Sequence, residues 1–207
     1  MAINQAKTKV MIFNMTRMLQ FPPELSLAEN EILEVVEEAK VLGVILSSDL
    51  KWTKNTDYII QKALKNMWVL RRMKNLGFDE QTLKDIYQKE IRSVLEFVVP
   101  VWTGALTDRD SVRIESIQKK VFKLILQHKY TNYQDACEQL KCDTLRDRRI
   151  KLCLKFSRKE LKKEDSIFNK LEPKVKTRHT HKKIVQEFTC LTERIFKSSL
   201  PFLQITK

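Results

Sequence analysis

The residues of this chain that could do chemistry are first of all its cations, which gather in one stretch. Residues 141–183 hold 16 Lys and Arg against 6 Asp and Glu, whereas residues 1–140 hold 20 against 18. A concentrated positive block favours a polyanionic partner, either a nucleic acid or an acidic membrane face, although a solvated charged surface has the same composition. The candidate phosphate contacts lie on a predicted basic helix: Arg146, Arg148, Arg149, Lys151 and Lys155.

Metal and thiol chemistry find little support in the sequence. The four cysteines are scattered and form no C-x-x-C pair, and the spacing of Cys137, Cys142, His179 and His181 matches no usual zinc module. We therefore predict no metal site and no cofactor in this chain. Free thiols fit an intracellular compartment, nucleus or cytoplasm. The sequence shows no apolar signal core and no apolar run of membrane-spanning length, so we expect no membrane partner.

The elements that would position these residues begin with short strands. Three apolar or alternating runs, 9–13, 31–36 and 40–46, lie close together in the first 52 residues, and Pro22-Pro23 places a loop between the first two. Their spacing predicts a small antiparallel meander. Gly43, inside the third run, indicates either a β-bulge or a close approach of another backbone.

After residue 52 the apolar period becomes helical. The spacing predicts a helix over 58–73 that stops at Gly77, and a second helix capped by Asp79 that ends at Pro100. Three further helices are predicted: one capped by Thr107 and Asp110, a short one from Asn132 or Tyr133 to Leu140, and the basic one from Thr144 to about Leu161. We therefore predict a mainly helical α+β protein, with Trp68 in the core.

Several short segments, taken in order, carry a resemblance to a known family. They are Asn4-x-x-Lys7-Thr8-Lys9, Lys40–Leu46, Ser47–Trp52, Arg71-Arg72-x-Lys74, Tyr87, Ile91–Glu96, Pro100-x-Trp102, Ile117–Lys119 and Thr192-Glu-Arg194 with Leu200-Pro201. This order resembles the end of the reverse transcriptase of non-LTR (LINE-type) retrotransposons, especially the CR1/Jockey-like group. The resemblance covers most of the chain, to about residue 160, and each motif alone is short.

The resemblance implies roles for residues of the first segments. Lys7 would lie near the phosphates of the incoming nucleotide as an auxiliary catalytic residue, protonating the leaving group. Lys40 and Gly43 would belong to the hairpin that grips the primer end, and Lys51 would contact nucleic acid close by. Read without the family, Lys7 and Lys9 are edge-strand lysines that oppose aggregation.

The resemblance also divides the chain. It implies a remnant of the polymerase palm over residues 1–52, a thumb-like helical bundle over 53–130 and a basic helical extension over 131–172, followed by a loosely ordered tail over 173–207. The thumb would lie along a primer–template duplex of RNA and DNA. Its implied contacts are Arg71, Arg72 and Lys74, although cations at a helix end also complement the helix dipole.

The carboxylates that would perform polymerase chemistry are missing from the sequence. In the family, two metal ions are clamped by aspartates that lie upstream of the segment at Asn4, and this chain has no Asp-Asp dipeptide and no aspartate before Asp49. We therefore expect a fragment of an RNA-directed DNA polymerase that binds nucleic acid and is inactive alone. Mg²⁺ would be needed only by a full-length enzyme, and the upstream polymerase portion is a candidate partner.

Two other functions remain open at the level of sequence. A helical bundle with a basic face could be a nucleic-acid-binding or protein-interaction module that docks an acidic protein and has no polymerase role. A helix-turn-helix regulator is also compatible with three helices before residue 130. The sequence, however, shows no short helix rich in Arg, Asn and Gln, the residues that contact bases in such regulators.

Overall fold

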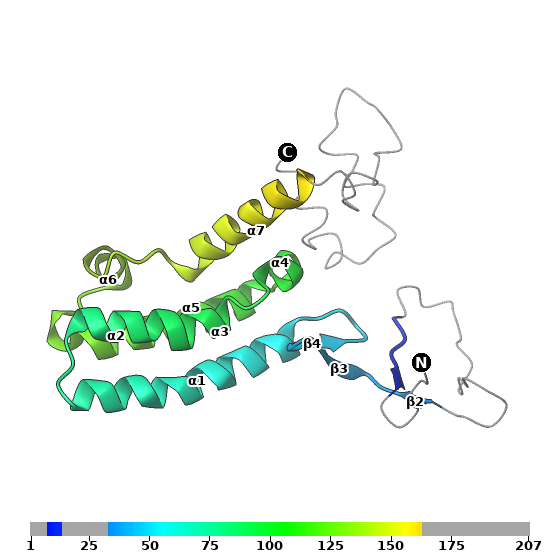
Figure 1. Cartoon of the computed structure of the whole chain (residues 1–207), viewed down its shortest axis with the longest axis horizontal. Coiled ribbons are helices and arrows are strands. Elements are labelled where there is room, and N and C mark those ends of the chain that lie inside the picture. Colours follow the sequence, from blue (N-terminus) through cyan, green and yellow to red (C-terminus); the bar gives the residue numbers. More distant parts are fainter. Residues whose placement is uncertain (1–7, 14–32, 163–207) are drawn as a thin grey trace.

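A computed structural model describes residues 8–13 and 33–162, and there the protein is a helical bundle with a small β-structure at one end (Figure 1). The longest helix, α1 (Thr53–Asn75), packs against α5 (Asp108–Leu126). A second rod packs on both helices, and it consists of α2 (Glu80–Ile86), the π-helix η2 (Tyr87–Arg92) and α3 (Ser93–Leu95). The predicted mainly helical α+β class is confirmed at this level.

A further layer covers the bundle on the side opposite α1 (Figure 1). Its main element is α7 (Leu145–Leu161), which packs on α4 (Val99–Trp102) and on α5. The short helix α6 (Tyr133–Gln139) precedes α7, and the 3₁₀ turns η3 (Thr103–Ala105) and η4 (Gln127–Lys129) flank α5. α7 packs on the bundle along one side, and its other side carries exposed side chains such as Arg146, Lys155 and Arg158.

Local capping explains where these helices begin. Asp79 accepts hydrogen bonds from the backbone N–H groups of residues 81 and 82, and Thr107, Asn132 and Thr144 each accept one from the residue three positions on. Every one of these starts was predicted from the sequence and is confirmed. The fully buried side chains at the predicted helical spacing form one core, the largest being Trp102, Tyr87, Phe122, Met67, Leu70 and Leu83.

The β-structure differs from the predicted three-stranded meander. β1 (Lys9–Val10) pairs in parallel with β2 (Glu34–Val35), and β3 (Glu38–Val41) pairs antiparallel with β4 (Val44–Ser47). The apolar pattern predicted one strand over 40–46, whereas the family resemblance implied a hairpin there, and the structure has a tight hairpin. Leu42 and Gly43 both adopt positive φ, 48° and 90°, which matches the twist of two-residue hairpin turns.

Two further predictions were wrong. The second helix does not run to Pro100, because it ends at Leu95 and Val98 turns left-handed; Pro100 instead lies in the first turn of α4, where a missing N–H is harmless. Trp68 is not in the core, since 66% of its surface is exposed. Trp102 is fully buried, and Trp52 packs at the edge of the core.

Some predictions lie outside the described residues. These concern Lys7, the histidines of the discarded zinc arrangement, the tail over 173–207, and the part of the basic extension that follows residue 162. Within the described residues, Cys137, Cys142 and Cys153 are buried free thiols, and burial raises the pKa of each, that of Cys137 to about 11. No helix among residues 8–13 and 33–162 has the length and apolar character to cross a bilayer.

Candidate nucleic-acid interface

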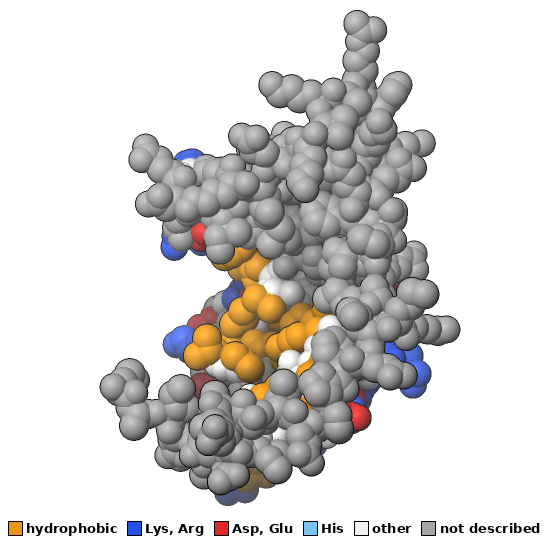
Figure 2. Space-filling view, turned by 90° about the vertical axis from the view of Figure 1, so that its right-hand side faces the viewer, with side chains coloured by type: hydrophobic (Ala, Val, Ile, Leu, Met, Phe, Trp, Pro, Cys, Tyr) orange, Lys and Arg blue, Asp and Glu red, His pale blue; other side chains and the backbone are white. Residues whose placement is uncertain are grey.

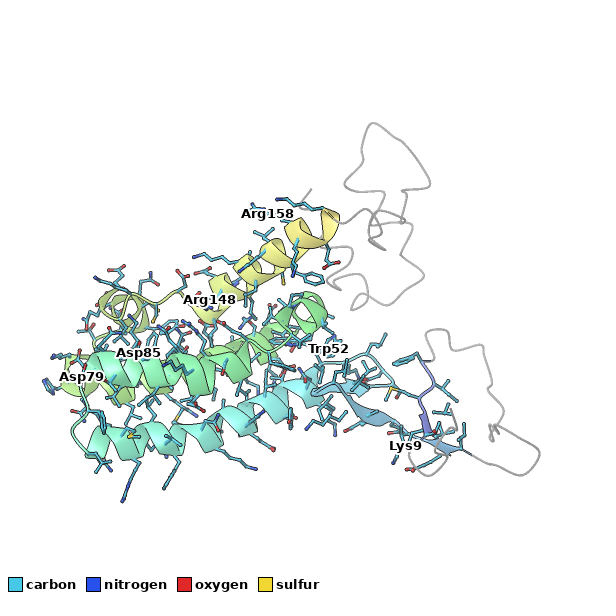
Figure 3. All side chains as sticks on the ribbon, viewed as in Figure 1. Lys9, Trp52, Asp79, Asp85, Arg148 and Arg158 are labelled. Atoms are coloured by element: carbon cyan, nitrogen blue, oxygen red, sulfur yellow. The ribbon has the colours of Figure 1, made fainter. Side chains whose placement is uncertain are left out.

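The cations predicted to bind phosphates on α7 fall into two groups. Arg149 is only 3% exposed, donates a hydrogen bond of 2.7 Å to Ser111 Oγ, and burial lowers its pKa. Arg148 points toward the bundle (Figure 3) and holds both carboxylate oxygens of Glu96, which raises its pKa. Both arginines are therefore occupied inside the protein, and we remove them from the candidate phosphate contacts.

The remaining predicted cations of α7 lie on its outer side. Lys151 pairs with Asp143 at 2.8 Å, and both side chains are largely exposed. Arg146 and Lys155 are exposed, as is Arg158, which projects from the far half of α7 (Figure 3). Only part of the positive charge of residues 141–183 is therefore available to an external polyanion.

The hairpin is attached to the start of α1 by its own polar side chains. Lys40 Nζ donates to the Tyr58 hydroxyl at 2.9 Å and lies over the tyrosine ring, and this hydrogen bond lowers the pKa of Tyr58. The Ile45 N–H donates to Asn55 Oδ1 at 3.1 Å. Lys51 pairs with Asp49 at 2.9 Å in the turn that follows. The structure thus places Lys40, Gly43 and Lys51 together at one end of α1.

Gly43 is the residue on which the hairpin most depends. A Cβ at this position would lie 3.1 Å from Cε1 of Phe97, so the turn passes close over the end of the second rod. The sequence interpretation of a close approach by another backbone differs from what is seen, because the neighbour of Gly43 is the side-chain ring of Phe97. The β-bulge interpretation is not what the structure shows, because the residue sits in the hairpin turn.

Replacing Gly43 with alanine should lower the free energy of unfolding by about 1–2 kcal/mol for the positive φ alone, plus a further loss from the clash with Phe97. Gly77→Ala is a matched control, because Gly77 has a φ of +86° and nothing within 4 Å of its Cβ position. Urea denaturation of both variants separates the two contributions. A Gly43→Ala loss no larger than that of Gly77→Ala would show that the Phe97 contact is absent in solution.

The α1 and α5 helices lie side by side and run in the same direction. Near their first turns, Arg113 of α5 pairs with Asp57 of α1. Near their last turns, Lys74 Nζ of α1 donates to the Ile125 carbonyl of α5 at 3.3 Å. Lys74, predicted to contact nucleic acid, therefore joins two helices. The segments between these two contacts must be neighbours along their whole length.

These neighbouring segments are free of carboxylates apart from Asp57, in the ion pair itself, and the largely buried Glu115. Residues 58–78 and residues 116–134 hold no Asp or Glu. We define the α1–α5 face as the exposed cations Lys65, Arg71, Arg72 and Lys120, with the exposed Trp68 beside them. Lys119 and Lys123 lie over the rings of Tyr133 and Tyr130, on the α6 side of α5, and are therefore not counted in this face. Two of the predicted residues, Arg71 and Arg72, belong to this face.

Sequence reasoning missed the α5 half of this face, because the charge count pointed to residues 141–183. A signal was present: both acid-free stretches can be read directly from the chain. What could not be read was their adjacency. Like charges on two neighbouring helices repel each other, so an acid-free face of this kind is unfavourable for the isolated protein and is relieved by a bound anion.

A separate apolar surface lies at the end of the molecule where the hairpin and α4 meet. Figure 2 looks onto this end and shows hydrophobic side chains gathered in a hollow. We name as the apolar end surface the exposed residues Leu42, Phe97, Val98 and Val101, of which Leu42 is 92% exposed. Exposed apolar clusters of this kind mark sites of contact with other proteins.

Comparison of the chain with protein-family models, with curated proteins and with solved structures found no match. The function therefore has to be argued from the two surfaces and from the segments that carry the family resemblance.

Proposed function

We propose that this chain is the nucleic-acid-binding end of a LINE-type reverse transcriptase, in which residues 53–130 act as the thumb that holds an RNA–DNA primer–template duplex. The observation that carries the proposal is the α1–α5 face, four exposed cations on acid-free stretches of two adjacent helices. In this proposal the chain holds the duplex, and an upstream polymerase portion supplies the aspartates and their Mg²⁺ ions. The protein would act in the nucleus or cytoplasm.

The physical reason is counterion release. Each phosphate neutralised by a Lys or Arg frees a condensed cation from the nucleic acid, so affinity falls steeply as salt rises. The α1–α5 face reads no base edges, because lysine and arginine contacts to phosphates position a duplex without specifying its sequence. The expected binding is therefore salt-dependent and nearly independent of sequence.

The test compares two variants that lose the same charge. Changing Lys65, Arg72 and Lys120 to glutamine should lower the slope of log affinity against log salt by about 3 and weaken hybrid-duplex binding about 100-fold. The matched control changes Arg146, Lys155 and Arg158, on α7, to glutamine. Fluorescence anisotropy with a labelled RNA–DNA hybrid, measured between about 50 and 200 mM salt, gives both quantities. The α1–α5 face would be rejected as the interface if the two variants lost the same affinity for the hybrid, or if tight binding did not change with salt concentration.

The apolar end surface favours a second candidate, a protein-interaction module. Leu42, Phe97 and Val101 present apolar area that a phosphate backbone cannot use, and a protein surface can. Within the first proposal, the upstream polymerase portion is the partner of this surface. Association with another protein that survives nuclease treatment, together with absence of hybrid-duplex binding, would favour the second candidate.

A further inference from the structure

Trp68 lies beside the cations of the α1–α5 face. It is 66% exposed, whereas Trp102 is fully buried and Trp52 packs at the edge of the core. A single exposed aromatic side chain is common on protein surfaces, and Trp68 differs because its neighbours at helical spacing are cations. Trp68 lies in the second half of α1, away from the apolar end surface. The charged side chains near it on α1 are all Lys and Arg, because residues 58–78 hold no Asp or Glu.

The neighbours of Trp68 are cations at helical spacing. Lys65 lies three residues before it, and Arg71 and Arg72 lie three and four residues after it, so all three border the indole on one face of the helix. From Lys65 to Arg72 the helix rises about 10 Å. Cations on both sides of one aromatic ring can hold the phosphates on both sides of one nucleotide.

The indole ring determines whether a bound nucleotide is paired or unpaired. Aromatic side chains bind nucleic acid by stacking on the face of a base, and every base has such a face. Inside a duplex both faces of each base are covered by neighbouring base pairs. An indole on a helix surface therefore finds a free face only at an unpaired base or at the end of a duplex.

We propose that Trp68 stacks on an unpaired base, with Lys65 and Arg72 holding the flanking phosphates, so that α1 binds single-stranded nucleic acid in addition to duplex. This inference rests on the proposed function, because it assigns a second ligand class to the same face. A strand of this kind would be the unpaired template or a displaced strand next to the duplex. Binding does not depend on base identity, since stacking is tolerant of sequence.

The experiment uses the full chain, a long blunt hybrid duplex whose interior sites far outnumber its two ends, and a single-stranded oligonucleotide of roughly 12 nucleotides, the length of one single-strand binding site. Single strand should quench tryptophan fluorescence, and Trp68→Phe should abolish most of the quenching. Trp68→Ala should weaken single-strand binding about tenfold and leave blunt-duplex binding within about twofold. Trp68→Phe should retain most of the affinity, because phenylalanine still stacks.

Each other outcome has a defined meaning. If Trp68→Ala weakens the binding of single strand and duplex equally, or weakens the binding of neither ligand, the stacking role is overturned. The duplex-binding proposal stands in both cases. Absence of binding to either ligand by the unchanged chain overturns both. Because Trp68 is exposed, Trp68→Ala should unfold at the same urea concentration as the parent, which verifies that any binding loss is local.

Discussion

Replacing Glu115 with alanine is expected to lower the free energy of unfolding by about 3–5 kcal/mol. Glu115 of α5 lies beneath the start of the last helical layer. Its Oε1 accepts a hydrogen bond from the Leu145 N–H at 3.0 Å and hydrogen-bonds to the Tyr133 hydroxyl. Its Oε2 lies 3.9 Å from Nη1 of Arg149. One carboxylate thus connects α5 to both α6 and α7.

The size of the effect comes from what the alanine would leave behind. Arg149 is 3% exposed, and within the described residues its Nη1 has no hydrogen-bond partner, so Glu115 is its counter-charge. A buried guanidinium without a counter-charge costs several kcal/mol. Burial, together with hydrogen bonding to Glu115, also raises the pKa of Tyr133, whose hydroxyl would lose its carboxylate partner.

Urea denaturation followed by circular dichroism measures the change, and two controls identify its cause. Glu115→Gln keeps an acceptor for the Leu145 N–H and removes the charge, so its loss reports the pairing with Arg149. The double variant Glu115→Leu/Arg149→Met removes both charges and should recover much of the stability. A Glu115→Ala loss below about 1 kcal/mol would mean that the carboxylate does not hold this layer.

Truncating Trp102 to alanine is the second large expected effect, a loss of about 3–5 kcal/mol. The indole is fully buried and is the largest side chain of the core, and its Nε1–H donates to the Phe97 carbonyl at 2.9 Å. That hydrogen bond closes the connection between α3 and α4, where Val98 is left-handed. Because α7 packs on α4, the cavity would loosen the attachment of α7 to the bundle.

The same substitution at an exposed tryptophan, Trp68, provides the control. Trp68→Ala removes an equal number of atoms from a side chain that is 66% exposed, so its stability change should stay within about 0.5 kcal/mol. Trp102→Phe should fall between the two, because it keeps most of the buried area and loses the hydrogen bond to Phe97. Equal midpoints for the Trp102→Ala and Trp68→Ala variants in urea would contradict the burial of Trp102.

The sequence by itself determined where four helices, α2, α5, α6 and α7, begin, whereas α1 starts at Thr53 without a side-chain cap, five residues before the predicted start. The four caps, at Asp79, Thr107, Asn132 and Thr144, act on backbone groups two or three residues away, so the chain carries both partners of each interaction in one short window. The apolar spacing of the core helices is local in the same sense. The absence of carboxylates from residues 58–78 and 116–134 is also written in the sequence alone.

Only the tertiary structure decided which side chains are available. Arg148 and Arg149 resemble Arg146 in the sequence, and they differ because Glu96 and Glu115, more than 30 residues earlier, meet them across the bundle. Trp68 has the spacing of a core residue, yet none of the described elements buries it on its side of α1. The two acid-free stretches became one cationic surface only when α1 and α5 packed side by side. Contacts between distant segments depend on the whole packing of the chain, and no local pattern records them.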